Sequence, residues 1–179
     1  LPPCIGLIKM AKIEPQAPDG VRPVNAHMVL FEPLIPGNAG SLARLCAGTH
    51  TVLHLVHPLG FELDDKHLKR AGLDYWPNVM WQEHNSIEEA LADIPRDELF
   101  FFTAGGTQRY TDAKMPSAPW LIFGKETTGL SQEIREKYSD RMFRVPVTGH
   151  IRSINLANVA TAVLYEALRQ NDFPDMEDA

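Results

Sequence analysis

The sequence has little cysteine and no long hydrophobic run. Only Cys4 and Cys46 occur among 179 residues and they form no CxxC pair, which excludes a disulfide-stabilised secreted scaffold. Thiols this sparse are typical of a reducing compartment, so we expect a cytoplasmic protein. No apolar stretch approaches the roughly 18 residues that a membrane-spanning helix needs, and no membrane association is expected.

Positive charge is also scarce, with 17 Lys and Arg against 23 Asp and Glu and a formal net charge of −6. Such a chain is no general nucleic-acid binder, although a local basic face could still bind RNA. The histidines are scattered and form no pattern such as H-E-x-x-H, so no metal is expected. The signatures G-x-G-x-x-G, G-x-x-x-x-G-K-[ST] and G-x-S-x-G are missing, which argues against dinucleotide binding, P-loop phosphate binding and serine hydrolysis.

The apolar segments that are present alternate in type along the chain. Short, continuously apolar segments alternate with segments whose apolar residues recur at helical spacing. Fully apolar strands are typical of a parallel sheet covered on both faces, so we predict a single α/β domain with a mostly parallel sheet flanked by helices. The predicted strands are residues 28–31, 52–56, 79–81, 99–103, 120–123 and 142–146, and the predicted helices are residues 38–48, 66–71, 86–94, 131–138 and 153–170.

Both ends of the chain differ from this pattern. Residues 1–26 contain five prolines and no periodic apolar pattern, so we interpret them as an N-terminal arm outside the fold. Residues 174–179 are interpreted as a solvated acidic tail. The folded domain is therefore predicted to span residues 27–173.

Glycine gathers where three predicted strands end, in residues 103–106 (TAGG), 124–130 (GKETTGL) and 145–150 (VPVTGH). Glycine lets a backbone approach a ligand closely, and parallel α/β sheets bind ligands beyond the carboxyl ends of their strands. For one such loop, ordinary turn chemistry is the better interpretation. Three together favour a nucleotide-like cofactor held by backbone groups.

Three ordered motifs resemble those of the SpoU-type (SPOUT) RNA 2′-O-ribose methyltransferases. They are residues 38–44 (NAGSLAR), residues 123–130 (FGKETTGL), and Val145-Pro146 followed by residues 152–158 (RSINLAN). Residues 58–61 (PLGF) and 64–75 (DDKHLKRAGLDY) are similar to the TrmL-like branch, which methylates the wobble nucleotide of certain tRNAs. The resemblance covers about residues 27–173.

The resemblance implies a fold, an activity and a set of site residues. The fold is an α/β-knot, in which the C-terminal segment threads a loop and forms the site for S-adenosylmethionine. The activity is methyl transfer to the ribose 2′-OH of nucleotide 34 (cytidine or 5-carboxymethylaminomethyluridine) in the anticodon stem-loop of tRNA-Leu-type substrates, by a homodimer formed through the C-terminal helix. Carried over by motif, the cofactor contacts are Phe102, Thr103, Gly106, Gly124, Val145, Ser153, Ile154 and Leu156, and the catalytic residues are Arg44, Asn38, Glu126, Ser153 and Asn155.

Substrate contacts are expected from basic residues, because RNA affinity comes mainly from phosphate contacts. Lys66, Lys69, Arg70, Arg152 and Tyr165 are the candidates for binding substrate, and His67, Arg109, Lys114 and Arg144 could extend the phosphate-binding surface. The alternative for the basic stretch is a solvated helix face. Tyr165 could stack at a dimer contact near the site or pack in the core.

The catalytic candidates also have plainer interpretations. Because a guanidinium stays protonated, we interpret Arg44 as a clamp on phosphate and 2′-oxygen, with a surface ion pair to Glu126 as the alternative. Asn38 could orient Arg44 or cap its helix. Glu126 could hold Arg44 or Asn155, or be solvated, and Ser153 and Asn155 could cap the last helix. Two other functions stay open: methylation of another tRNA or rRNA position, and a knotted nucleotide-binding protein without catalysis.

Overall fold

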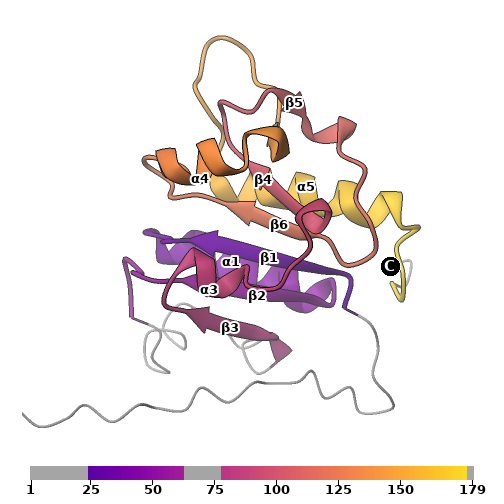
Figure 1. The fold of residues 1–179 in the computed structure, drawn as a ribbon. Helices are drawn as coiled ribbons and strands as arrows, with labels where there is room; N and C mark the ends of the chain where they lie inside the picture. The colour runs from indigo at the N-terminus through magenta and orange to yellow at the C-terminus, as the bar shows by residue number, and fades with distance from the viewer. Residues whose placement is uncertain (1–23, 63–77, 177–179) are drawn as a thin grey trace, which may run out of the picture.

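The computed structural model describes residues 24–62 and 78–176 (Figure 1). Its strands are β1 (Ala26–Phe31), β2 (Thr51–Val56), β3 (Trp81–His84), β4 (Leu99–Phe102), β5 (Gln108–Arg109), β6 (Trp120–Phe123) and β7 (Met142–Arg144). Its α-helices are α1 (Pro36–Gly48), α3 (Ile87–Ala90), α4 (Gln132–Lys137) and α5 (Leu156–Gln170), and short 3-10 helices cover Arg96–Glu98, Tyr110–Asp112 and Ser139–Arg141.

The described strands form one sheet in the order β3-β2-β1-β6-β4-β7-β5, and every neighbouring pair is parallel. Helices α1 and α5 lie on one face of the sheet, and α3 and α4 lie on the other (Figure 1). Alternate residues of β1 serve the two cores, Met28 and Leu30 on the α1–α5 side and Val29 and Phe31 on the other, as the two-residue period of a strand requires. The predicted α/β fold with a mostly parallel, helix-flanked sheet is confirmed.

Several element limits differ from the prediction. Strand β3 begins at Trp81 rather than at residue 79, because the half-buried segment WQEH forms the outer edge of the sheet. Helix α3 ends at Ala90 rather than at residue 94, ahead of Asp93, whose φ of 63° is not helical. Strand β5 has two exposed residues and no apolar signal, and was not predicted. The predicted helix over residues 66–71 lies outside the described residues.

Both described ends of the domain contact its core. The side-chain amide of Asn25 is buried and donates to the carbonyls of Thr49 (3.0 Å) and Pro174 (3.1 Å). Met176 packs against the core on the α1–α5 side. Residues just outside the predicted limits of 27 and 173 therefore pack on the domain. Residues 1–23 of the predicted arm and residues 177–179 of the predicted tail lie outside the described residues.

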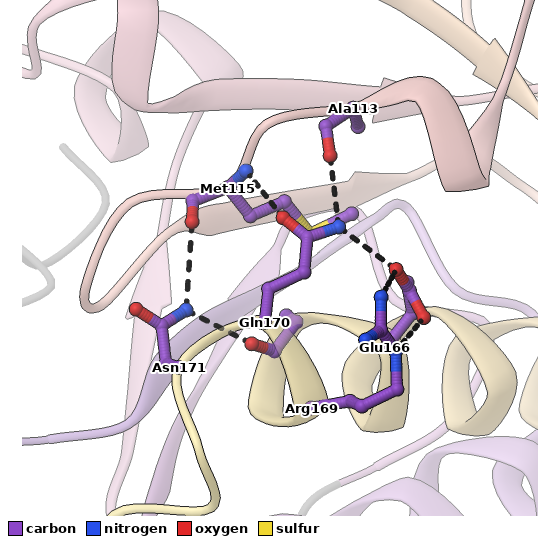
Figure 2. Close-up of polar contacts among 7 residues, drawn as sticks. Ala113, Met115, Glu166, Arg169, Gln170 and Asn171 are labelled. Atoms are coloured by element: carbon purple, nitrogen blue, oxygen red, sulfur yellow. Dashed lines mark hydrogen bonds and ion pairs between the residues drawn. The ribbon is translucent and has the colours of Figure 1, made fainter.

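The last turn of α5 fastens the segment that connects β5 to β6 (Figure 2). The Gln170 amide accepts from the Met115 backbone N–H (2.9 Å) and donates to the Ala113 carbonyl (2.9 Å). Asn171 donates to the Met115 carbonyl at 3.5 Å, and Glu166 accepts a further bond from Gln170 at 2.9 Å. These bonds tie the C-terminal helix to a connection more than fifty residues earlier in the chain. Within residues 24–62 and 78–176, no helix is long and apolar enough to cross a membrane.

Three histidines that are distant in the sequence form a hydrogen-bonded row across β1, β2 and β3. His27 Nδ1 lies 3.0 Å from His54 Nε2, and His54 Nδ1 lies 2.9 Å from His84 Nε2. The His27 ring stacks on Trp120 with centroids 4.2 Å apart and an interplanar angle of 6°. His54, in the middle of the row, is buried. The histidines are thus scattered only in the sequence, because the parallel register gathers three of them on one face.

We predict that this row makes the protein acid-sensitive. Burial lowers the pKa of His27 to about 4 from 6.5 and lowers the pKa of His54 and His84 as well. Below pH 6.5 the unfolded chain therefore binds a proton at His27 that the folded chain does not bind. The free energy of unfolding falls as a result, until the pH passes the folded pKa of about 4. His27 alone should contribute a loss of about 2 kcal/mol between pH 7 and pH 5.

Urea unfolding at pH 7 and pH 5 measures this loss. His27→Phe keeps a ring on Trp120 but cannot be protonated, so its stability should fall less between the two pH values than that of the wild type. Equal losses in the two proteins would contradict the prediction.

Candidate functional site

A cavity of about 800 Å³ opens at the carboxyl ends of the strands. The last residues of β4, β5, β6 and β7 line it, together with the first turns of α1 and α5. This is the edge where parallel α/β sheets bind ligands. The predicted site residues in its lining are Asn38, Phe102, Thr103, Gly124, Glu126, Val145, Arg152, Ser153, Ile154, Asn155 and Leu156.

The cavity is apolar where the strands end and polar along its loops. Phe102 and Phe123 end β4 and β6, and their rings stack with centroids 5.2 Å apart. Leu156 and Val159 line the cavity from α5. The three glycine-bearing loops contribute residues 103–105, 124–129 and 145–147, so backbone amides and carbonyls surround an apolar floor. Such a lining suits a flat aromatic base with polar substituents.

A chain of hydrogen bonds joins the three sequence motifs beside this cavity. Asn38 Nδ2 donates to Glu126 Oε1 (3.1 Å), and Asn155 Nδ2 donates to Asn38 Oδ1 (3.0 Å). Asn155 Oδ1 in turn accepts from the Ala157 backbone N–H (2.8 Å) at the start of α5. Residues up to 117 positions apart are therefore held in one arrangement.

Glu126 is the anionic end of this chain. Partial burial alone would raise the pKa of its carboxyl, but hydrogen bonds from Leu34 N–H, Ile35 N–H and Asn38 favour the carboxylate more strongly and leave the pKa below its usual value. The negative charge lies beside the N-terminus of α1, where the helix dipole stabilises it further. Glu126 is therefore ionised at neutral pH and organises the loop before α1.

This geometry changes two interpretations of single residues. Asn38 does not cap its helix, because α1 begins at Pro36 with Ile35 at the N-cap position, and the Asn38 side chain is buried against Glu126 and Asn155. Asn155 does cap α5, as predicted, and the helix therefore begins at Leu156 rather than at Ser153. Glu126 is not simply solvated, because its carboxylate holds Asn38, which holds Asn155.

The glycines of the site serve backbone packing. A Cβ on Gly124 would lie 2.2 Å from the Gly129 carbonyl carbon, so the loop folds back on itself only with glycine here. Gly129 has a φ of 70°, which favours glycine, and exchanges two backbone hydrogen bonds with Lys125. Gly106 lies outside the cavity lining, and a Cβ there would lie 2.4 Å from the Phe143 backbone. Its role in the structure is the close approach to β7.

Some predicted residues do not meet at the cavity. Arg44 and Tyr165 are exposed on α1 and α5 and do not line it. Lys66, Lys69 and Arg70 lie outside the described residues. Arg135 of α4 lines the cavity but was missed, because nothing in the local sequence of α4 signals that the fold brings this helix to the cavity. In the part of the chain that the structure describes, no group of three His, Cys, Asp or Glu could hold a metal ion.

Comparisons with known proteins agree with these motifs. Residues 25–165 match the model of the SpoU rRNA Methylase family. The tRNA (cytidine(34)-2′-O)-methyltransferase of Methylovorus glucosotrophus (strain SIP3-4) is 44% identical over 147 residues, which are 82% of this chain and 96% of that protein. A second similar protein was solved in a study of structural insights into the 2-OH methylation of C/U34 on tRNA. Its sequence is 40% identical to this chain, and the two folds superpose with a TM-score of 0.76 over 82% of this chain and 96% of that chain.

A further solved structure is the SpoU methyltransferase AviRb from Streptomyces viridochromogenes in complex with AdoMet. It is 26% identical, with a TM-score of 0.71, over 88% of this chain and 61% of that chain. The family model covers well over half of the sequence, and the three motifs identified in this chain all lie within its residues 25–165 and contribute to one cavity. The chain belongs to the SpoU family of RNA 2′-O-methyltransferases.

Proposed function

We propose that this chain transfers a methyl group from S-adenosylmethionine to the ribose 2′-OH of nucleotide 34 in a tRNA. The target is cytidine or 5-carboxymethylaminomethyluridine in tRNA-Leu-type substrates, bound through the anticodon stem-loop in the cytoplasm. The observation that carries the proposal is the Glu126–Asn38–Asn155 hydrogen-bond chain, which joins all three motifs beside the cavity. The names of the relatives support nucleotide 34 of tRNA as the target.

The cavity fits the proposed cofactor. Its apolar floor of Phe102, Phe123 and Leu156 suits an adenine, and the surrounding loop backbone suits the polar groups of a nucleoside. The neighbour AviRb was crystallised with AdoMet. We infer that Thr103, Gly124, Val145, Ser153 and Ile154 complete the contacts. When bound, S-adenosylmethionine supplies a methyl group already activated by the positive sulfonium.

The residues of the chain then have to align the ribose and handle one proton. Alignment of reacting groups can supply up to ~7–11 kcal/mol in well-oriented intramolecular systems. Glu126 fixes Asn38, and Asn38 fixes Asn155 at the start of α5, so these side chains form a rigid wall beside the cavity. Arg44 is proposed to hold a phosphate and the 2′-oxygen from outside the cofactor cavity, and the proton would leave through phosphate or water.

We propose that the domain is a knot formed by its C-terminal segment. Strand β7 lies between β4 and β5, which are consecutive in the chain, and α5 follows it. The β4–β6 pairing closes a ring that contains β5 and the segment fastened by Gln170. Because β7 inserts beside β4 and α5 follows it, this arrangement supports a C-terminal segment that is threaded through the ring.

Methylation of unmodified tRNA followed by nucleoside mapping tests the proposed activity. We expect 2′-O-methylation at nucleotide 34 and its loss when a 2′-deoxy nucleotide replaces that residue. Methylation at another position would favour the sister-enzyme alternative. Cofactor binding without methylation of total RNA would favour a non-catalytic knotted protein.

We predict a homodimer that forms through α5. Tyr165 on this helix is 43% exposed and lies outside the cavity, so its ring is available to contact a second copy. A dimer would also pool the basic surface of an acidic chain. Light scattering at micromolar concentration should give twice the 20.0 kDa chain mass, and Tyr165→Asp should shift the species toward the monomer. A wild-type mass of one chain would contradict this prediction.

A further inference from the structure

Positive charge gathers at the cavity, against the acidic balance of the chain. Arg109, Arg135, Arg144 and Arg152 line the cavity, and Glu126 is the one carboxylate in the lining formed by the described residues. Lys125 also lines it and pairs with Glu32. Within residues 24–62 and 78–176, no ion pair involves any of the four guanidinium groups. Four cations without carboxylate partners at one site favour an anionic ligand.

Arg109 and Arg144 are paired with each other in the sheet. They are the last residues of β5 and β7, and they are direct partners in the parallel ladder. Neighbouring strands lie about 4.8 Å apart, so two guanidinium-bearing side chains leave the sheet edge side by side. Like charges directly opposite each other destabilise a sheet. An anion bound between them would offset this repulsion, and guanidinium groups are suited to bidentate phosphate binding.

The proposed cofactor carries no phosphate, and its single carboxylate is outweighed by a positive ammonium and a positive sulfonium, so its net charge is positive. The proposed RNA substrate carries one phosphate per nucleotide. We propose, resting on the proposed function, that Arg109 and Arg144 together clamp one backbone phosphate of the substrate RNA. The β5 edge lies three strand spacings, about 14 Å, from β6, which leads into Gly124 and Glu126. The clamp thus anchors the RNA across the cavity from the Glu126–Asn38–Asn155 chain.

Binding of a synthetic anticodon stem-loop RNA, followed by fluorescence anisotropy, tests the clamp without requiring methyl transfer. Arg109→Ala and Arg144→Ala should each weaken RNA binding about tenfold. The negative slope of log K against log salt should become shallower by about 0.7, the value for one phosphate contact on a single strand. Affinity for S-adenosylmethionine, measured by calorimetry, should stay at the wild-type value. Arg96→Ala removes the same charge from an exposed ion pair with Asp140 and should leave RNA binding unchanged.

A scan of the RNA with single neutral methylphosphonate linkages locates the phosphate. At one linkage, neutralisation should weaken binding by the wild type about tenfold and binding by the Arg109→Ala/Arg144→Ala double variant less than twofold. Additive effects at every linkage, wild-type affinity in both single variants, or no binding of the stem-loop by the wild type would each overturn the clamp. If the clamp is found but no RNA is methylated, the proposed function fails by itself. If RNA is methylated and both arginines are dispensable for binding, the clamp fails by itself.

Discussion

Replacement of Arg44 by alanine is expected to lower methyl transfer by ~10²-fold or more, which corresponds to about 3 kcal/mol of added barrier. Arg44 belongs to the first motif and is exposed on α1, outside the cavity that we assign to the cofactor. Its loss should therefore remove a contact to the substrate and leave affinity for S-adenosylmethionine nearly unchanged. Because alanine is a good helix former, the variant should also keep the fold.

Single-turnover assays with tRNA, together with calorimetry for the cofactor, measure the two effects separately. Arg44→Lys should also lose most of its activity, because a point charge does not replace the planar fork of a guanidinium. Arg96→Ala, which removes an exposed arginine far from α1 in the sequence, serves as the matched control and should react at the wild-type rate. Methyl transfer by Arg44→Ala at the wild-type rate would show that Arg44 is only a surface residue.

Gly124→Val is expected to abolish binding of S-adenosylmethionine and to destabilise the fold. A Cβ at residue 124 would lie 2.2 Å from the Gly129 carbonyl carbon and 2.4 Å from the Leu130 nitrogen, so the backbone of the loop would have to move. The same loop carries Glu126 and lines the cavity, and its displacement would also break the Glu126–Asn38 hydrogen bond. Overpacking of this kind costs about 3 kcal/mol or more when backbone atoms are the obstacle.

Gly105→Ala is the matched control for this variant. Gly105 also lines the cavity, but a Cβ there meets no atom within 4 Å. Urea unfolding should therefore place Gly105→Ala close to the wild type and Gly124→Val well below it. Calorimetry should detect cofactor binding in the first variant and none in the second. Wild-type cofactor affinity in Gly124→Val would contradict the assignment of this loop to the cofactor site.

Local patterns in the sequence were sufficient for the class of the fold and for most of its elements. The continuous apolar strands and the helical stripe of α5 predicted a parallel sheet covered on both faces, because burial on both sides leaves no polar alternation. The second and third motifs likewise predicted many residues that line the cavity, since they include residues at the ends of β6 and β7 and at the start of α5, whereas the first motif lies within α1 and contributes Asn38. The sequence-based prediction was least accurate for the two edge strands. Strands β3 and β5 are short and polar, and their pairing depends on neighbouring strands rather than on their own residues.

The tertiary structure alone decided which residues meet. Strand β6 enters the sheet between β1 and β4, and no local period specifies that order, because a two-residue alternation says which face a side chain occupies but not which strand lies beside it. The order of all the strands decides which distant residues meet. It brings together Asn38 and Asn155, the row of His27, His54 and His84, and the pair of Arg109 and Arg144. Gly124 shows the same limit for backbone contacts, since the atoms that require glycine there belong to a loop that folds back on itself.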